Sequence, residues 1–174
     1  THGDHEKPVL KKHHINLLKE LEEGNLAKVH MSERLRNLQT FSGIKDYPLP
    51  EKFVGTLRPY QKAGYNWLRF LNEFHLGGCL ADDMGLGKTV QTLALLQAEK
   101  EKGNVGTSLL IMPTSLIYNW EMEAAKFTPD LKIFTYTGTL RNKDISRFSK
   151  YDVVLTSYGI TRLDVELFQK FYFN

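Results

Sequence analysis

Short apolar runs alternate with helical segments over most of the chain, from about residue 51 to residue 174. Four of these runs, "GCLA", "SLLIMP", "KIFTY" and "DVVLTS", are each followed by a turn or by a stretch with helical periodicity. Strands that are apolar along most of their length are typical of a parallel sheet whose two faces are both covered by helices. The pattern therefore predicts an open α/β domain.

The first 47 residues have a different pattern. Apolar residues recur at helical spacing in "INLLKELEEG", which ends at a glycine, and again in "SERLRNLQTF". Two prolines in "SGIKDYPLPEK" then interrupt the helical pattern. We therefore expect a helical N-terminal extension over residues 1–47 and a separate α/β domain over residues 48–174.

Length and composition restrict the class of protein further. A chain of 174 residues that is 41% hydrophobic can bury one core and a small appendage. No apolar run approaches the roughly 20 residues that cross a bilayer, and the N-terminus has no signal-peptide core, so we expect an intracellular protein outside the membrane. The single cysteine, Cys79, excludes an intrachain disulfide framework and is predicted to lie in the core. The formal charge of +3 is compatible with nucleic-acid binding but does not require it.

The stretch "GCLADDMGLGKT" runs from an apolar segment into glycines, a lysine and a threonine, and "KTVQTLALLQAEKEK" predicts a helix after it. Such a loop presents backbone N–H groups to an anion, and the helix N-terminus adds partial positive charge. Gly85 and Gly87 would let the backbone turn tightly. Lys88 would reach the β- and γ-phosphates of a nucleotide, and the Thr89 hydroxyl would ligate magnesium. Asp82 replaces the first glycine of the common G-x-x-x-x-G-K-T pattern, but the remaining residues predict a phosphate-binding loop.

Four blocks occur in the order "LRPYQKAGYNWL", "LADDMGLGKT", "LLIMPTSLIYNWEMEAAKF" and "DVVLTSYGI". Together they resemble the first ATPase lobe of the SWI/SNF-type family of DNA-translocating, helicase-like motors, over about residues 48–174. The resemblance implies a RecA-like lobe with a mostly parallel sheet, ATP and magnesium as cofactors, duplex DNA as a partner and a second ATPase lobe. It also implies a location in the cytoplasm of a bacterium or the nucleus of a eukaryote.

The resemblance implies nucleotide-binding roles for residues around the loop. Gln61 would read adenine, because a side-chain amide offers a donor and an acceptor to the N6 and N7 edge of the base. Arg58 and Tyr60 would shape the adenine pocket, although a surface glutamine at a helix start is the alternative for Gln61. Asp83 and Leu86 are the remaining loop residues with an implied nucleotide-binding role. The two acidic residues, Asp82 and Asp83, would shape the loop and the surroundings of the magnesium ion, and neither would serve as a general base.

The last two blocks are implied to contact the DNA backbone. A strand that ends at Pro113 predicts a following helix capped by Thr114 or Ser115, whose hydroxyls and first N–H groups can hold a phosphate. Thr156, Ser157 and Tyr158 end another strand at the same carboxyl edge of the sheet, where open α/β sheets bind ligands. Capping alone would account for Thr114 and Ser115 equally well. The five basic residues between 131 and 150 are predicted to form a solvated face.

ATP hydrolysis in this family also needs an Asp-Glu box and arginines from a second lobe. Neither follows "TSYGI" in this sequence, so we expect a part of a longer motor that binds ATP without turning it over. A small-molecule kinase explains "GLGKT" but not "LRPYQ", and an RNA helicase lobe explains both blocks poorly. The remaining alternative is a nucleic-acid-binding or scaffold module with a decayed loop, which the intact Lys88 and Thr89 argue against.

Overall fold

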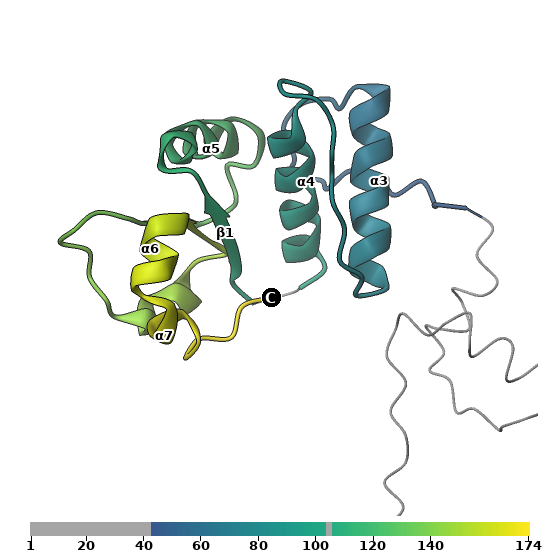
Figure 1. Ribbon diagram of the computed structural model, residues 1–174. Helices are drawn as coiled ribbons and strands as arrows, with labels where there is room; N and C mark the ends of the chain where they lie inside the picture. The colour runs from purple at the N-terminus through teal and green to yellow at the C-terminus, as the bar shows by residue number, and fades with distance from the viewer. Residues whose placement is uncertain (1–42, 104–105) are drawn as a thin grey trace, which may run out of the picture. The chain divides into compact units, whose positions relative to one another are not determined.

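The computed structural model describes residues 43–103 and 106–174 (Figure 1). Residues Ile44–Asn174 form one compact unit. Nearly all of the predicted N-terminal helical extension lies outside the described residues. The elements are, in chain order, α3 (Pro59–Glu73), α4 (Lys88–Glu101), β1 (Ser108–Met112), α5 (Thr114–Phe127), β2 (Ile133–Tyr136), the 3-10 helix η2 (Ile145–Lys150), β3 (Val153–Ser157), α6 (Tyr158–Leu163) and α7 (Val165–Phe168).

Within the described residues, three parallel strands form the sheet in the order β1-β3-β2. The central strand, β3, is buried along its whole length, as expected for an apolar strand covered on both faces. The strands predicted at "SLLIMP", "KIFTY" and "DVVLTS" are confirmed, and so is the helix after the glycine loop. The predicted class, an α/β lobe with a parallel sheet covered by helices, is therefore confirmed.

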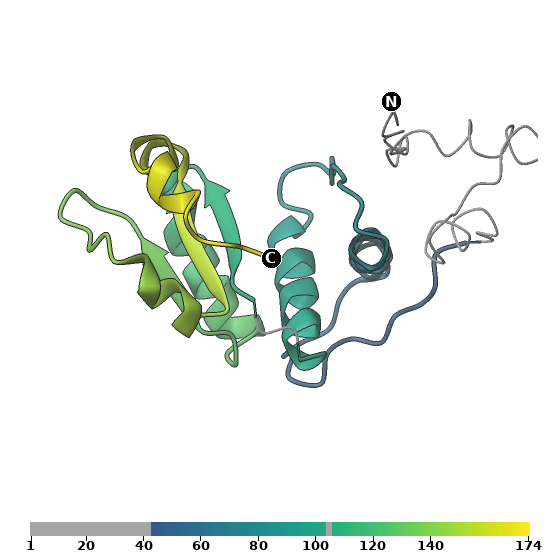
Figure 2. The same cartoon turned by 90° about the horizontal axis from the view of Figure 1, so that it is seen from below.

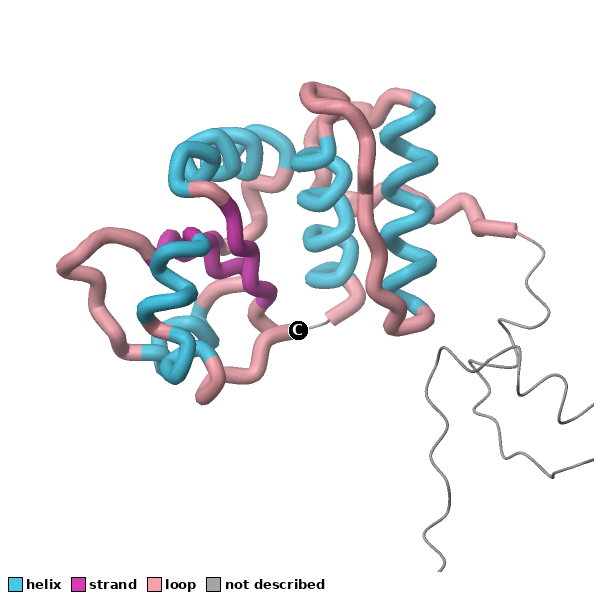
Figure 3. Tube along the Cα trace, in the orientation of Figure 1, coloured by secondary structure: helices cyan, strands magenta, loops and turns pink. Residues whose placement is uncertain are grey.

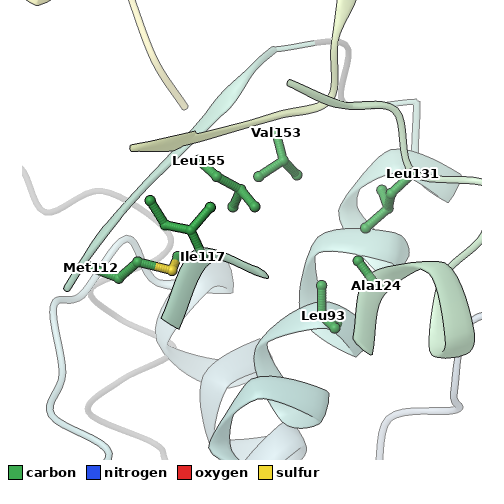
Figure 4. Close-up of a cluster of buried hydrophobic side chains, with 7 residues drawn as sticks. All are labelled: Leu93, Met112, Ile117, Ala124, Leu131, Val153 and Leu155. Atoms are coloured by element: carbon green, nitrogen blue, oxygen red, sulfur yellow. The ribbon is translucent and has the colours of Figure 1, made fainter. Parts of the chain in front are cut away.

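Side chains of β3 alternate between two cores, one on each face of the sheet. Figure 4 shows the first core, in which α4 and α5 contribute side chains that pack with the sheet. Val154, between two members of that core, joins an aromatic core instead, in which the Tyr136 and Phe148 rings lie nearly perpendicular at 5.4 Å between centroids. The first core comprises Leu93, Met112, Ile117, Ala124, Leu131, Val153 and Leu155. The aromatic core comprises Tyr136, Phe148, Val154 and Phe168.

Helix α3 lies beside α4 (Figures 1 and 2). A third core joins these helices to the segment that precedes α3, and it comprises Phe53, Leu57, Tyr65, Val90, Ala94 and Ala98. This packing places α3 against the helix that follows the glycine loop. No helix in the described ranges is long and apolar enough to cross a membrane.

The prediction of a strand at "GCLA" is wrong. Residues 76–83 are not assigned to a strand and form part of the loop that connects α3 to α4 (Figure 3). A strand needs ladder hydrogen bonds from a neighbour, and none of the described strands pairs with this segment. Cys79 was predicted to lie in the core but is exposed, because no layer covers it. The loop lies close to α3, since a Cβ at Gly78 would come within 2.2 Å of the Leu71 side chain.

Candidate functional site

The glycine loop has the conformation that its sequence predicts. Gly85 and Gly87 have φ angles of +84° and +80°, in the left-handed region that side chains other than glycine rarely adopt. Gly87 is the N-cap of α4, and the first helical hydrogen bond runs from the Gln91 N–H to the Gly87 carbonyl at 3.3 Å. The N–H groups of the first turn therefore have no acceptor within the helix, which leaves them free to bind an anion.

Lys88 is held by two main-chain oxygens of the same loop. Its Nζ donates to the carbonyls of Asp82 at 2.6 Å and Asp83 at 2.8 Å. Lys88 is partly exposed, and so is Thr89, which follows it in the first turn of α4. Because an ammonium group forms stronger hydrogen bonds with charged oxygens than with neutral carbonyls, a phosphate can replace these partners.

Gln61 connects the start of α3 to the glycine loop. Its Oε1 accepts a hydrogen bond from the Arg58 N–H at 2.9 Å, and its Nε2 donates to the Leu86 carbonyl at 3.1 Å. A Cβ at Gly87 would lie 2.5 Å from Nε2, so the loop approaches closely only because Gly87 lacks a side chain. Gln61 therefore caps the start of α3, a role that the sequence analysis did not predict. Adenine recognition by Gln61 stays a prediction, for which one N–H and one lone pair of the amide remain.

The other predicted nucleotide-binding residues surround this contact. Arg58 is the N-cap of α3 and is exposed, and the Tyr60 side chain beside it is 40% exposed. Asp83 is exposed in the loop, and Leu86 is partly exposed. The donor set fits a phosphate group, since it combines an ammonium group with unpaired N–H groups. The Thr89 hydroxyl fits magnesium, which commonly takes few protein ligands and completes its shell with phosphate oxygens and water.

The predicted cap of α5 is wrong in its position. The N-cap is Pro113, with an extended backbone at φ −57° and ψ 140°, and no side chain makes a cap hydrogen bond there. Thr114 is instead the first helical residue, because the helix starts directly after the proline. Thr114 and Ser115 are both exposed, so their hydroxyls and the first-turn N–H groups face solvent together.

Thr156 and Ser157 lie inside the unit rather than on its surface. Thr156 is 0% exposed, and its hydroxyl donates to the Tyr136 carbonyl of the neighbouring strand at 2.9 Å. Ser157 is 5% exposed and caps α6 by accepting from the Ile160 N–H at 3.4 Å. The burial of both hydroxyls does not fit the predicted direct contact with a DNA phosphate. The motif identified the strand end but not the face that each side chain takes.

The residue that reaches solvent at this strand end is Tyr158, which is 63% exposed. Its contact with a DNA phosphate stays a prediction. Met112 of β1 pairs with Ser157 of β3, so the chain leaves both strands at the same edge of the sheet. Figure 1 shows the N-terminal end of α4 on the same side of the unit as this edge. The glycine loop and the start of α5 therefore face one side.

A buried cluster around Asp164 was also missed. Asp164 is 5% exposed and accepts hydrogen bonds from the Tyr136 hydroxyl at 2.8 Å and from Arg141 Nε at 2.6 Å. Lys143 Nζ lies 2.9 Å from its other oxygen. Burial pushes the pKa of Asp164 upward, but the hydrogen bonds from Lys143, Tyr136 and Arg141 outweigh it, and the pKa lies below its ordinary value. Part of the basic stretch predicted as a solvated face is thus paired internally.

Comparisons with known proteins give a consistent family. Residues 60–174 match the model of the SNF2-related domain. The chain is 45% identical over 136 residues to the Bacillus subtilis protein YwqA, which covers 76% of this chain and 15% of YwqA. It is 43% identical over 135 residues to Helicase SWR1 of Candida albicans, and this match covers 74% of this chain and 8% of that helicase. The chain thus spans a small part of these curated relatives.

Solved structures agree with the fold. The Sulfolobus solfataricus SWI2/SNF2 ATPase core in complex with dsDNA has a TM-score of 0.58 and 40% identity, over 68% of this chain and 26% of that chain. The ATPase core domain from the same organism has a TM-score of 0.60 and 35% identity, over 77% of this chain and 25% of that chain. The RecA-like fold and the resemblance deduced from four sequence blocks are therefore confirmed, and this chain belongs to the SNF2-related domain family.

Proposed function

We propose that this chain is an ATP-binding part of the first ATPase lobe of a DNA-dependent, DNA-translocating motor. The observation that carries the proposal is the state of Lys88, which donates to two neutral carbonyls within a glycine loop at the N-terminus of α4. A cation with such partners can exchange them for phosphate oxygens at little cost. The relationship to helicase-like ATPases supports the same conclusion.

In this proposal the loop binds the phosphates and α3 supplies the base pocket. Lys88 would leave the carbonyls of Asp82 and Asp83 for the β- and γ-phosphates, while the first-turn N–H groups donate to the same oxygens. Gln61 would read the adenine edge. The Thr89 hydroxyl would hold a magnesium ion that arrives with the nucleotide, and that ion would supply neutralisation of phosphate charge. Around this centre, Arg58, Tyr60, Asp83 and Leu86 would shape the pocket and the loop.

Duplex DNA is the proposed macromolecular partner. Thr114 and Ser115 would hold a backbone phosphate, because their hydroxyls and the first N–H groups of α5 are exposed together. Thr156 and Ser157 would support this surface from inside by fixing the end of β3 and the start of α6. The solved relative in complex with dsDNA supports this choice of partner.

The whole protein would supply what turnover needs beyond the described residues. Phosphoryl transfer in this class depends on an acidic box and on arginines from a second lobe. We therefore propose that the 174-residue chain binds ATP without hydrolysing it, while the whole protein couples hydrolysis to movement along DNA. It would work in the cytoplasm of a bacterium or the nucleus of a eukaryote.

Calorimetric titration of the chain with ATP and with GTP, each with magnesium, tests the proposal. We expect weak binding of ATP, weaker binding of GTP, and loss of ATP binding in Lys88→Ala. Equal affinity for the two nucleotides would remove Gln61 from adenine recognition. Absence of binding to either nucleotide at millimolar concentration would favour a nucleic-acid-binding or scaffold module. Phosphate release by the isolated chain at the rate of an intact motor would contradict the expected lack of turnover.

A further inference from the structure

Gln91 is a buried amide next to the glycine loop, one turn into α4. It is 0% exposed, its Nε2 donates to the Gly87 carbonyl at 3.3 Å, and its Oε1 has no hydrogen-bond partner within the described residues. A buried oxygen without a partner is unfavourable. An apolar side chain of similar length would fill the same space without that penalty, so the amide donor is the group that this position uses.

The neighbouring helix leaves room for this amide. A Cβ at Gly64 of α3 would lie 1.9 Å from Oε1 of Gln91 and 3.0 Å from its Cδ. Gly64 lies within α3, where glycine is less favourable than alanine. The glycine is thus explained by the carboxamide that occupies the space of its missing side chain.

The Gly87 carbonyl accepts from Gln91 twice, through the main-chain N–H and through Nε2, both at 3.3 Å. The peptide unit that contains this carbonyl also contains the Lys88 N–H, and in a planar trans peptide the two groups point in opposite directions. Fixing the Gly87 carbonyl along the helix therefore aims the Lys88 N–H outward, into the concave side of the loop.

Gln61 acts in the same way on the preceding peptide unit. Its Nε2 fixes the Leu86 carbonyl at 3.1 Å, and that carbonyl shares a peptide unit with the Gly87 N–H. Two amide side chains, one from α3 and one from α4, thus fix two consecutive peptide units of the loop. Consecutive N–H groups held in this way form the kind of concavity that binds phosphate.

We propose that Gln91 is a positioning residue that orients the Lys88 N–H toward the nucleotide phosphates, with Gly64 providing the space for its carboxamide. The inference rests on the proposed ATP binding and deepens it. Loss of the Gln91 donor should weaken phosphate binding without removing the charge of Lys88. Recognition of the adenine base would be unaffected, because Gln61 keeps its own contacts.

The test compares Gln91→Met with Gln97→Met in the full 174-residue chain. Gln97 is a matched control, because it lies on the same helix, is 0% exposed, and also has an Oε1 without a partner among the described residues. Its Nε2 donates to Glu101 Oε1 at 3.0 Å, toward the other end of α4. Gly64→Ala provides a second route, since it displaces the Gln91 carboxamide without replacing Gln91.

Affinities for ATP and for inorganic tripolyphosphate, with unfolding midpoints, form the readout. Gln91→Met should lower the affinity for both ligands by roughly tenfold, whereas Gln97→Met should change these affinities by less than about twofold. Gly64→Ala should also lower the affinity for both ligands, and the double variant with Gln91→Met should lose little further affinity. Tripolyphosphate has no base, so weaker binding of it assigns the effect to the phosphate loop rather than to the base pocket, and the unfolding midpoints report any general loss of structure.

Four outcomes would overturn the inference. Wild-type affinities in Gln91→Met would show that its donor does not position the loop. An equal loss in Gln97→Met would assign the effect to the stability of α4. Should Gln91→Met fail to fold, unchanged ligand affinities in Gly64→Ala would have the same meaning. Failure of the wild-type chain to bind ATP would refute the proposed function itself, and the inference with it.

Discussion

Lys88 and Asp164 are two charged side chains of the same compact unit, and they differ in exposure and in the kind of partner that each contacts. Lys88 is partly exposed and is held by two neutral carbonyls of its own loop. Asp164 is 5% exposed and is held by three side chains, two of them cationic. The partners of Lys88 lie five and six positions away along the chain, whereas those of Asp164 lie more than twenty positions away.

The difference separates a group that can take a ligand from one that holds the fold. Replacing the carbonyls around Lys88 by a phosphate leaves no buried charge unpaired. Replacing Asp164 would leave the Arg141 guanidinium without its carboxylate partner, in a site where the Arg141 side chain is 8% exposed and that of Asp164 is 2% exposed. We therefore expect substitutions at Lys88 to affect activity and substitutions at Asp164 to affect stability.

The largest effect is expected from Lys88→Ala in the whole protein. DNA-stimulated ATP turnover should fall by at least about 10²- to 10³-fold, because a charge that stabilises the transferring phosphate is lost. DNA binding should remain, since Thr114 and Ser115 lie on another helix. Steady-state phosphate release and DNA binding by fluorescence anisotropy provide the measurements. Unchanged turnover in a folded variant would contradict the role assigned to the glycine loop.

Asp164→Ala should have the next largest effect, on stability. Removing one partner of a buried ion pair typically costs about 3–5 kcal/mol, because the remaining charge stays buried. The free energy of unfolding should fall by that amount in urea titrations. Asp144→Ala is the control, since the exposed Asp144 caps η2 through Ser146 and its loss should cost much less. Equal losses in the two variants would show that the Asp164 cluster contributes no more than a surface cap.

Local sequence carries enough information for some of these features and too little for others. The positive φ angles at Gly85 and Gly87 were predictable, because the turn that a phosphate loop makes requires glycine. The strand at "GCLA" was predicted wrongly, because a strand depends on a neighbour that the segment itself does not encode. The cluster that joins Tyr136, Arg141 and Asp164 could not be predicted from spacing, since only the fold brings these residues together.

Motifs have a similar limit at the proposed DNA-binding side of the unit. They place Thr114 and Thr156 at two strand ends, yet the first is exposed and the second is 0% exposed. Their elements decide this difference, because Thr156 lies within the fully buried strand β3, whereas Thr114 lies in the first turn of α5. Both threonines belong to blocks that are implied to contact DNA, so the fold is needed to separate them.

Acid should reveal a smaller contribution to stability from the carboxylates. Hydrogen bonds from Lys52 and Lys100 lower the pKa of Asp130 to about 2. A carboxyl whose pKa is lower in the folded protein stabilises it above its ordinary pKa and loses that contribution as pH falls. The free energy of unfolding should therefore decrease between about pH 4 and pH 2. In urea titrations at a series of pH values, the free energy of unfolding of Asp130→Asn should fall less steeply with decreasing pH, and the difference in slope should correspond to up to about one bound proton. Lys88→Ala should keep the slope of the wild-type chain. An equally steep decrease in Asp130→Asn would contradict the assignment.

The smallest effects should distinguish the exposed and buried hydroxyls at the proposed DNA surface. Thr114→Ala should weaken binding of duplex DNA by about two- to tenfold, because an exposed hydroxyl that donates to a phosphate is lost, and stability should hardly change. Thr156→Val should leave DNA affinity unchanged but lower the free energy of unfolding by about 1 kcal/mol, because the Tyr136 carbonyl loses its buried donor. Anisotropy titrations of labelled duplex DNA at low and moderate salt, with urea titrations of the same variants, measure both effects. A loss of DNA affinity in Thr156→Val that equals the loss in Thr114→Ala would mean that burial at the end of β3 does not separate supporting residues from DNA-binding ones.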